Sequence, residues 1–379
     1  MSTPTLLTPD ELRLALSVRD LTDPGQGPHA IQLAARQIVQ AQAAAGLAVD
    51  VRTGGPVVPL ADNYDNLGYE PDAVTRDARY TRYVDRDHVL RSHTSARVPP
   101  ALRDLARHPG LEDLLIVSAG MCYRRDSIDW QHTGTPHQLD LWRITRDSRS
   151  ADDRALTAMI GEVVEAVLPS AAWRTVPSPH PYTTLGREIQ AEWHGEWVEI
   201  GECGLAACHV LHRAGLGRDH AGLAMGLGLD RLLMLRKGIP DIRLLRSSDP
   251  RVASQMLDLT PYRSVSQQPP VRRDLSVVLG AHAEANDEIL GDRVRIALGN
   301  DAEVVETVEV VSEMSYDELP ALARHRLGIV LGQRNVLIRL VLRPLDRTLT
   351  DHEANLVRDR VYAELHEGST AHWAADPMR

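Results

Sequence analysis

Residues 222–257 read GLAMGLGLDRLLMLRKGIPDIRLLRSSDPRVASQML, and the interpretation of the whole chain starts from them. From 224 to 229 glycine alternates with apolar residues, which predicts a strand with little side chain on one face. A ligand can approach the backbone over such a face because glycine has no side chain. Arg231 follows, and then a helix is expected over 232–237, closed by Gly238. An arginine at this turn suits phosphate binding. The alternative is a buried strand followed by a surface arginine.

A second arginine stands at the end of another predicted strand. Residues 114–120, LLIVSAG, are apolar and run on to Arg124, a polar loop follows over 127–136, and residues 137–144 form the returning strand. The pattern predicts a β-hairpin with an arginine where its first strand ends. An exposed arginine on an ordinary hairpin is the alternative.

These two patterns resemble motifs of a known family. Residues 226–231, GLGLDR, are similar to motif 3 of the class II aminoacyl-tRNA synthetases, and the hairpin with Arg124 is similar to motif 2. The runs 238–243 and 248–251 resemble the phenylalanyl branch, although Asp230 stands where that family has glutamate. The resemblance implies an α+β fold, in which a class II antiparallel sheet with flanking helices is followed by a ferredoxin-like domain.

A predicted helix over 29–45 and a strand over 47–51 occupy the place of motif 1, which in the family usually forms a dimer interface. The apolar periodicity of residues 29–45 would fit an ordinary surface helix equally well, with no role in a dimer.

The resemblance implies ATP as a substrate and Mg²⁺ as a cofactor. Arg124 and Arg231 would clamp phosphates and act as the catalytic residues, and His132 would lie near the adenylate. Within 197–200, WVEI, Glu199 would face Mg-ATP and hold the metal. Glu202 carries little weight, because acidic residues on a strand are more often solvated than metal-binding.

The resemblance also implies a pocket for an aromatic amino acid. In LRSHTS, residues 90–95, His93 and Ser95 would reach the substrate, and Gln138 and Asp140 would hold its α-amino group. The family usually has Glu-Gly where this chain has Asp140 and Leu141. The sequence alone does not decide whether the shorter Asp140 side chain reaches the α-ammonium group.

The segment 177–183, PSPHPYT, resembles the wall of the ring pocket. Relatives carry Phe-Pro-Phe or Asn-Pro-Tyr there, and this chain carries His180 and Tyr182 around its proline. Tyr182 can present a ring edge to an aromatic substrate, whereas His180 brings strict phenylalanine specificity into question. Ala224 corresponds to the small residue that limits the depth of the pocket.

The C-terminal part is predicted to be a separate domain. Strands near 272–279, 304–311 and 336–342 and helices over 285–298 and 350–367 follow the β-α-β-β-α order of a ferredoxin-like unit. The runs PVRRD (270–274) and DRTLTD (346–351) resemble the anticodon-binding domain of phenylalanyl enzymes. We therefore predict a catalytic domain over 1–257, a linker over 258–268 and an anticodon-binding domain over 269–379. The candidate tRNA contacts are Arg272, Arg273, Arg347 and His372.

Length and composition bound the remaining possibilities. The chain has 379 residues, a formal net charge of −10 and three cysteines without a CxxC pair. This charge argues against non-specific coating of nucleic acid, and the cysteine usage favours a reducing compartment. No signal peptide or membrane-length apolar run is seen, so we expect a cytoplasmic protein without membrane contact. The resemblance to the mitochondrial-type enzymes favours a monomer.

The function expected from the resemblance is ATP-dependent activation of phenylalanine and its transfer to the 3′ end of tRNA(Phe). One alternative is a paralogue that activates a non-standard aromatic amino acid, and another is a catalytically inactive tRNA-binding regulator. The chain contains no phenylalanine. This absence leads to the hypothesis of a backup or resistance enzyme, made when charged phenylalanine tRNA is scarce.

Overall fold

The computed structural model describes residues 5–44, 46–77, 80–108, 110, 113–265, 268–281, 283–345 and 347–370. The chain forms two compact units. Unit 1 comprises Met1–Arg124, Thr135–Pro240 and Ala253–Arg263, and unit 2 comprises Arg125–Gly134, Asp241–Val252 and Ser264–Arg379.

Unit 1 is built on a seven-stranded sheet in the order β1-β5-β6-β10-β9-β8-β7, in which β1 runs parallel to β5 and every other pair is antiparallel. Its helices and strands are α1 (Pro9–Ser17), α2 (Ala30–Ala43), β1 (Ala48–Val51), β2 (Val57–Pro59), α3 (Leu60–Asn63), β3 (Arg82–Tyr83), β4 (His88–Leu90), α4 (Val98–Arg107), β5 (Asp113–Met121), β6 (His137–Thr145), α5 (Asp153–Val167), β7 (Trp173–Pro177), β8 (Thr183–Trp193), β9 (Glu196–Ala206), α6 (Cys208–Arg213), β10 (Ala221–Gly228) and α7 (Leu229–Lys237). This arrangement confirms the predicted α+β class.

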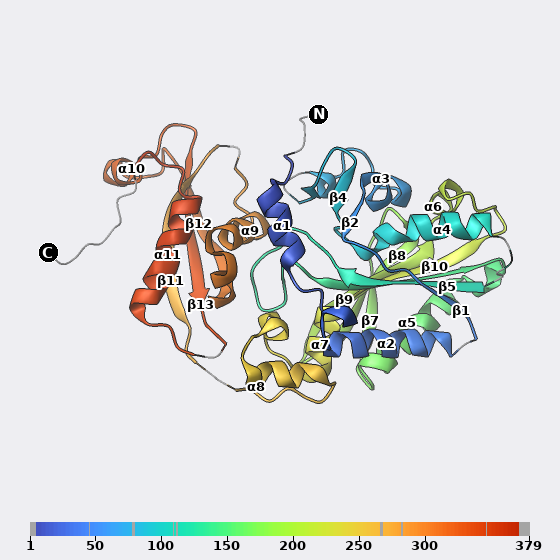
Figure 1. Cartoon of the computed structure of the whole chain (residues 1–379). Coiled ribbons are helices and arrows are strands. Elements are labelled where there is room, and N and C mark those ends of the chain that lie inside the picture. Colours follow the sequence, from blue (N-terminus) through green and yellow to red (C-terminus); the bar gives the residue numbers. More distant parts are fainter. Residues whose placement is uncertain are drawn as a thin grey trace. The chain divides into compact units, whose positions relative to one another are not determined.

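Helices cover both faces of the sheet. Figure 1 shows α4 and α6 on one face and α2, α5 and α7 on the other. The α4 side is closed by a buried apolar cluster to which β5, β6, β10, α4 and α6 all contribute, including Ile116, Trp142 and Ala224. On the opposite side α5 buries an apolar stripe that includes Met159, as its sequence period predicts.

The strand and helix predicted from the opening stretch are both present. β10 leads without a break into α7, which ends at Gly238 in the left-handed conformation with φ of 68°. Only residues tolerant of positive φ fit this cap, and glycine is the commonest of them. The first part of the predicted linker is tied to this helix end. The ammonium of Lys237 donates to the backbone oxygen of Asp258 at 2.9 Å and to that of Thr260 at 2.5 Å.

The segment 57–90 forms a second, smaller sheet within unit 1. Strands β2, β4 and β3 form a small three-stranded sheet, and the short helix α3 starts between β2 and β3. The Tyr64 hydroxyl donates to the carbonyl oxygen of Thr75 at 3.0 Å, which fixes a polar segment that shows no apolar periodicity.

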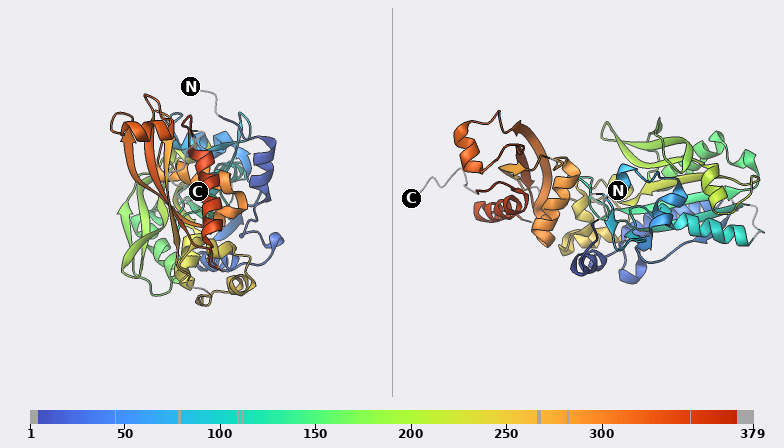
Figure 2. Two further views of the ribbon diagram at one scale, coloured as in Figure 1. Left: turned by 90° about the vertical axis from the view of Figure 1, so that its left-hand side faces the viewer. Right: turned by 90° about the horizontal axis from the view of Figure 1, so that it is seen from above.

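Unit 2 contains a three-stranded antiparallel sheet in the order β11-β13-β12. Its elements are α8 (Pro250–Ala253, at the border of the two units), β11 (Val271–Leu279), α9 (Asp287–Leu298), β12 (Val305–Ser315), α10 (Ala321–Leu327), β13 (Arg334–Leu342) and α11 (Asp351–Leu365). Figures 1 and 2 show α9 and α11 against one face of this sheet. Helix α11 begins with a capping box, since the Thr350 hydroxyl accepts from the Glu353 backbone N–H and the Glu353 carboxylate accepts from the backbone of Thr350.

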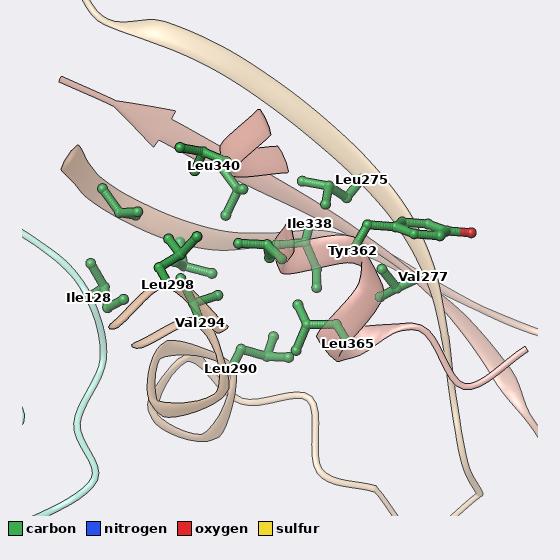
Figure 3. Close-up of a cluster of buried hydrophobic side chains, with 14 of the residues drawn as sticks. Ile128, Leu275, Val277, Leu290, Val294, Leu298, Ile338, Leu340, Tyr362 and Leu365 are labelled. Atoms are coloured by element: carbon green, nitrogen blue, oxygen red, sulfur yellow. The ribbon is translucent and has the colours of Figure 1, made fainter. Parts of the chain in front are cut away.

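One segment of the predicted catalytic domain folds with unit 2. Ile128, in the loop between β5 and β6, is buried among apolar side chains of α9, α11 and the three-stranded sheet (Figure 3). The guanidinium of Arg295 donates to the carbonyl oxygens of Asp126 at 2.6 Å and Ser127 at 2.7 Å. Residues 125–134 therefore belong structurally with the C-terminal sheet, and so do residues 241–252.

Within the described ranges no helix is both long enough and apolar enough to cross a membrane.

Candidate active site

On β10 most residues are buried, but Gly226 and Gly228 are partly exposed. In the pairing of β9, β10 and β6, Glu202 lies opposite Gly226, and Gly226 lies opposite Asp140. A Cβ built on Gly226 would meet nothing closer than Glu202 Cγ at 3.8 Å and Asp140 Oδ1 at 3.9 Å. A Cβ on Gly204 would instead stand 2.6 Å from Thr183 Cβ. Gly204 is thus required for packing, whereas Gly226 leaves a bare floor between two carboxylates.

Asp140 is held at one side of this floor by the turn that precedes α4. Its Oδ2 accepts from the Thr94 hydroxyl at 2.5 Å and its Oδ1 from the Ser95 hydroxyl at 2.7 Å. Gln138 is nearby, since its Oε1 accepts from the Thr94 backbone at 3.3 Å. Burial raises the pKa of Asp140 to about 6, although the two hydroxyl hydrogen bonds act to lower it. Three of the predicted substrate contacts, Ser95, Gln138 and Asp140, are therefore together.

His93 lies one residue before this turn and faces aromatic rings. Its ring stacks on Tyr69 with centroids 5.7 Å apart and meets Tyr64 edge-on at 6.1 Å. Neither buried ring nitrogen has a hydrogen-bond partner among the described residues. Burial lowers the pKa of His93 to about 4, so the ring is neutral near pH 7.

A polar triad forms the other side of the floor. The Nε2 of His180 lies 2.8 Å from Glu202 Oε2, and the Tyr182 hydroxyl donates to Glu202 Oε1. The rings of His180 and Tyr182 stack at 5.8 Å, and Tyr182 also packs at 5.9 Å from the ring of Trp142. Ala224 is fully buried in the same apolar cluster as Trp142 and Tyr182.

Arg231 sits on the first turn of α7. Its Nη1 donates to Glu199 Oε2 at 3.1 Å and to the Glu199 backbone oxygen at 3.2 Å. The preceding Asp230 is buried and accepts from the Nδ1 of His137 at 2.8 Å. The Nε2 of His137 in turn accepts from the backbone of Leu21 at 3.1 Å. This chain of bonds fixes the turn at which the strand becomes a helix, and so it fixes the direction of Arg231.

Arg124 follows β5, whose extension is secured by a hydrogen bond from the Tyr123 backbone to the Arg91 oxygen at 2.8 Å. The positive charge of Arg124 acts to lower the pKa values of His93 and Tyr69. His132 belongs to unit 2, where its Nδ1 lies 2.6 Å from Asp129 Oδ2.

Of the candidate tRNA contacts, two arginines hold the start of α11. Arg273 pairs with Asp351 at 2.8 Å and donates to Asn355 at 2.9 Å, and Arg347 pairs with Glu353 at 2.8 Å. Arg272 is exposed on β11. His372 and Asp346 lie outside the described residues.

Magnesium binds readily through one or two carboxylates together with substrate phosphates. No group of three or more histidine, cysteine, aspartate or glutamate residues able to hold a metal occurs in the part of the chain that the structure describes. Glu199 keeps 47% of its side-chain surface accessible and lies beside the phosphate-type donor Arg231. This single open carboxylate fits a metal that arrives with a nucleotide, not a closed protein site.

An antiparallel sheet with arginines at two strand ends and an open glycine strand between them is the architecture of a class II aminoacyl-tRNA synthetase. A family model described as "tRNA synthetases class II core domain (F)" matches residues 23–256. The chain belongs to this family, and it is an aminoacyl-tRNA synthetase.

Three curated relatives extend the match beyond the core. The chloroplastic/mitochondrial phenylalanine–tRNA ligase of Arabidopsis thaliana is 28% identical over 82% of this chain and 70% of that protein. The mitochondrial enzymes of Saccharomyces cerevisiae and Mus musculus are 26% and 29% identical, over 82% and 81% of this chain and 80% and 71% of those proteins. The solved pyrrolysyl tRNA synthetase of Desulfitobacterium hafniense, at 18% identity and a TM-score of 0.46 over 57% of this chain and 73% of that chain, is too distant to carry an argument.

Sequence reasoning missed Tyr69 and His137 and gave Glu202 little weight. Tyr69 lies in a polar segment without periodicity, and His137 acts through Asp230, which is 93 residues away in the sequence. The alternation in β9 could have indicated Glu202, because it lies opposite the glycine strand.

Proposed function

We propose that the chain activates phenylalanine with ATP and transfers it to the 3′ end of tRNA(Phe). The observation that carries the proposal is the bare floor at Gly226, which lies between Asp140 and Glu202 on neighbouring strands. The names of the relatives support the choice of amino acid. An ammonium group would lie against Asp140, which accepts from the Thr94 and Ser95 hydroxyls and from Trp142 Nε1 at 3.4 Å but has no cation bonded to it within the described ranges.

In this mechanism the protein orients charged groups and transfers few protons. Arg124 and Arg231 would hold phosphate oxygens while the amino-acid carboxylate attacks the α-phosphate in line, so orientation and charge stabilisation supply most of the rate. Arg231 would exchange its bond to Glu199 for phosphate, which leaves the Glu199 carboxylate for Mg²⁺. Bound there, Mg²⁺ would neutralise the charge of the departing pyrophosphate.

ATP–pyrophosphate exchange with a panel of amino acids tests the proposal. We expect exchange that depends on phenylalanine and is lost in Arg124→Ala and Arg231→Ala. Exchange with no aromatic amino acid, together with retained tRNA binding, would instead favour the inactive tRNA-binding regulator.

Unit 2 is proposed as the anticodon-binding part, with Arg272, Arg273 and Arg347 near the RNA. The β-α-β-β-α order and the two sequence runs support this role. Because Arg273 and Arg347 are already paired with acidic residues, RNA phosphates would have to replace carboxylates there. The proposed domain limits, 1–257, 258–268 and 269–379, stay predictions, and so do the monomeric state and the cytoplasmic location. Light scattering that gave twice the chain mass would exclude the monomer.

The absence of phenylalanine from the chain supports a second, separate hypothesis of a backup or resistance enzyme. Synthesis of such a protein would require no phenylalanyl-tRNA, which is the product that the enzyme restores. Expression in cells whose resident phenylalanyl enzyme is blocked tests it. The protein should accumulate and restore growth, and failure of either would refute the hypothesis.

A further inference from the structure

The His180–Glu202–Tyr182 triad has no evident part in holding ATP or an α-amino group. Glu202 stands across Gly226 from Asp140, on the side of the floor that carries the aromatic rings. Its side chain keeps 39% of its surface accessible. A partly exposed carboxylate thus lies beside Gly226 and next to the aromatic rings, where the ring of the substrate is proposed to lie.

The hydrogen bonding of Glu202 is incomplete. Among the described residues, its oxygens are bonded by His180 Nε2 and the Tyr182 hydroxyl, one on each oxygen. An ionised carboxylate offers about four lone-pair sites, so each oxygen can accept from one further donor. Burial raises the pKa of Glu202, but the bonds from His180 and Tyr182 bring it below its usual value, so the group is charged at neutral pH.

An unsubstituted phenyl ring would displace water from this charge and donate nothing in return. Removing hydration from a charged group without a replacement is costly. A ring that carries a hydroxyl would instead donate to Glu202 and complete its bonding. The same carboxylate therefore penalises one substrate and stabilises the other.

We propose that Glu202, positioned by His180 and Tyr182, is a specificity residue that selects a phenylalanine analogue with a hydroxyl group on its ring. This inference rests on the proposed function, because it assumes that the side chain of the amino acid lies against the His180 and Tyr182 rings. Ala224 is buried in the same apolar cluster as Tyr182, and the triad supplies the polar group that would receive the hydroxyl.

The test measures kcat/KM in ATP–pyrophosphate exchange for phenylalanine, meta-tyrosine and tyrosine. For each of the two hydroxylated substrates, its kcat/KM is divided by that of phenylalanine to give a ratio. One hydrogen bond to a charged group is worth about a 10- to 100-fold preference in kcat/KM. The wild-type ratio should therefore be about 10 to 100 for the isomer whose hydroxyl reaches Glu202. Glu202→Gln removes the charge at nearly constant size and should reduce the ratio about tenfold or more. His180→Phe removes one of the two donors that position Glu202 and should lower the ratio as well, and it serves if Glu202→Gln does not fold.

Glu196→Gln is the matched control, since Glu196 is an exposed carboxylate at the other end of the same strand. The ratio in this variant should equal that of the wild type. If phenylalanine supports exchange but both wild-type ratios are one or less, or the Glu202 and His180 variants leave them unchanged, the inference is overturned while the proposed function stands. If none of the three amino acids supports exchange, the proposed function itself fails.

Discussion

Replacing Gly226 with alanine is expected to separate catalysis from folding. Gly226 is not among the residues with positive φ, so alanine can adopt its backbone conformation. The added Cβ would make ordinary contacts at 3.8 and 3.9 Å with Glu202 and Asp140. We therefore expect the free energy of unfolding to stay the same or to rise by about 0.4–1 kcal/mol, as at other compatible glycines.

The same methyl group would project from the floor on which the substrate is proposed to lie. A displacement of about 1 Å between reacting groups lowers rates by roughly 100-fold, which corresponds to about 2.7 kcal/mol of activation free energy. The assay is ATP–pyrophosphate exchange beside urea unfolding of the same preparation. A stable variant with wild-type exchange would refute the placement of the substrate over β10.

Gly204→Ala is the contrasting control from the neighbouring strand. Its Cβ would approach Thr183 Cβ to 2.6 Å, so the backbone must shift. Overpacking of this kind costs about 1–3 kcal/mol, and stability should fall before activity is affected in any specific way.

Four further outcomes are expected. Because Asp140 has a pKa of about 6 and must be ionised to attract an ammonium group, kcat/KM for the amino acid should fall as pH drops through that value, and Asp140→Asn should abolish this inflection while lowering activity. Arg231→Ala should reduce the rate of exchange by about 10²–10³-fold without loss of fold, as measured by exchange and circular dichroism. Ala224→Gly should raise exchange with para-chloro-phenylalanine by at least about tenfold, and an unchanged rate would place Ala224 away from the pocket floor. Ile128→Ala should destabilise unit 2 by about 2–5 kcal/mol in urea unfolding, whereas the half-exposed Val311→Ala should change it by less than about 0.5 kcal/mol.

Much of the fold could be predicted because its main elements have strong local signals. β10 and α7 follow from the glycine alternation and the closing Gly238, and α11 follows from its Thr350 capping box. The small sheet β2-β4-β3 could not be predicted, because its strands span only two or three residues and are held by contacts such as Tyr64 to Thr75.

Site residues could be predicted from the sequence only where a reactive residue type stands at the end of a recognisable strand or helix. Arg124 and Arg231 stand at element ends, where an arginine is conspicuous. The bonds of Asp140 to Thr94 and Ser95 join positions 46 and 45 residues apart, and the pair of His180 and Glu202 depends on the register of β8 and β9. Such pairings are set by tertiary structure. The folding of residues 125–134 with unit 2 arises in the same way, because Ile128 finds its apolar contacts far along the chain.

The most direct measurement is the charging of tRNA(Phe) with labelled phenylalanine in the presence of ATP and Mg²⁺. We predict a base-labile aminoacyl ester on the terminal adenosine, formed by the wild-type chain and not by Arg124→Ala at equal tRNA occupancy. Binding of tRNA(Phe) without ester formation by the wild-type chain would contradict the assignment of this chain as a phenylalanine-charging enzyme.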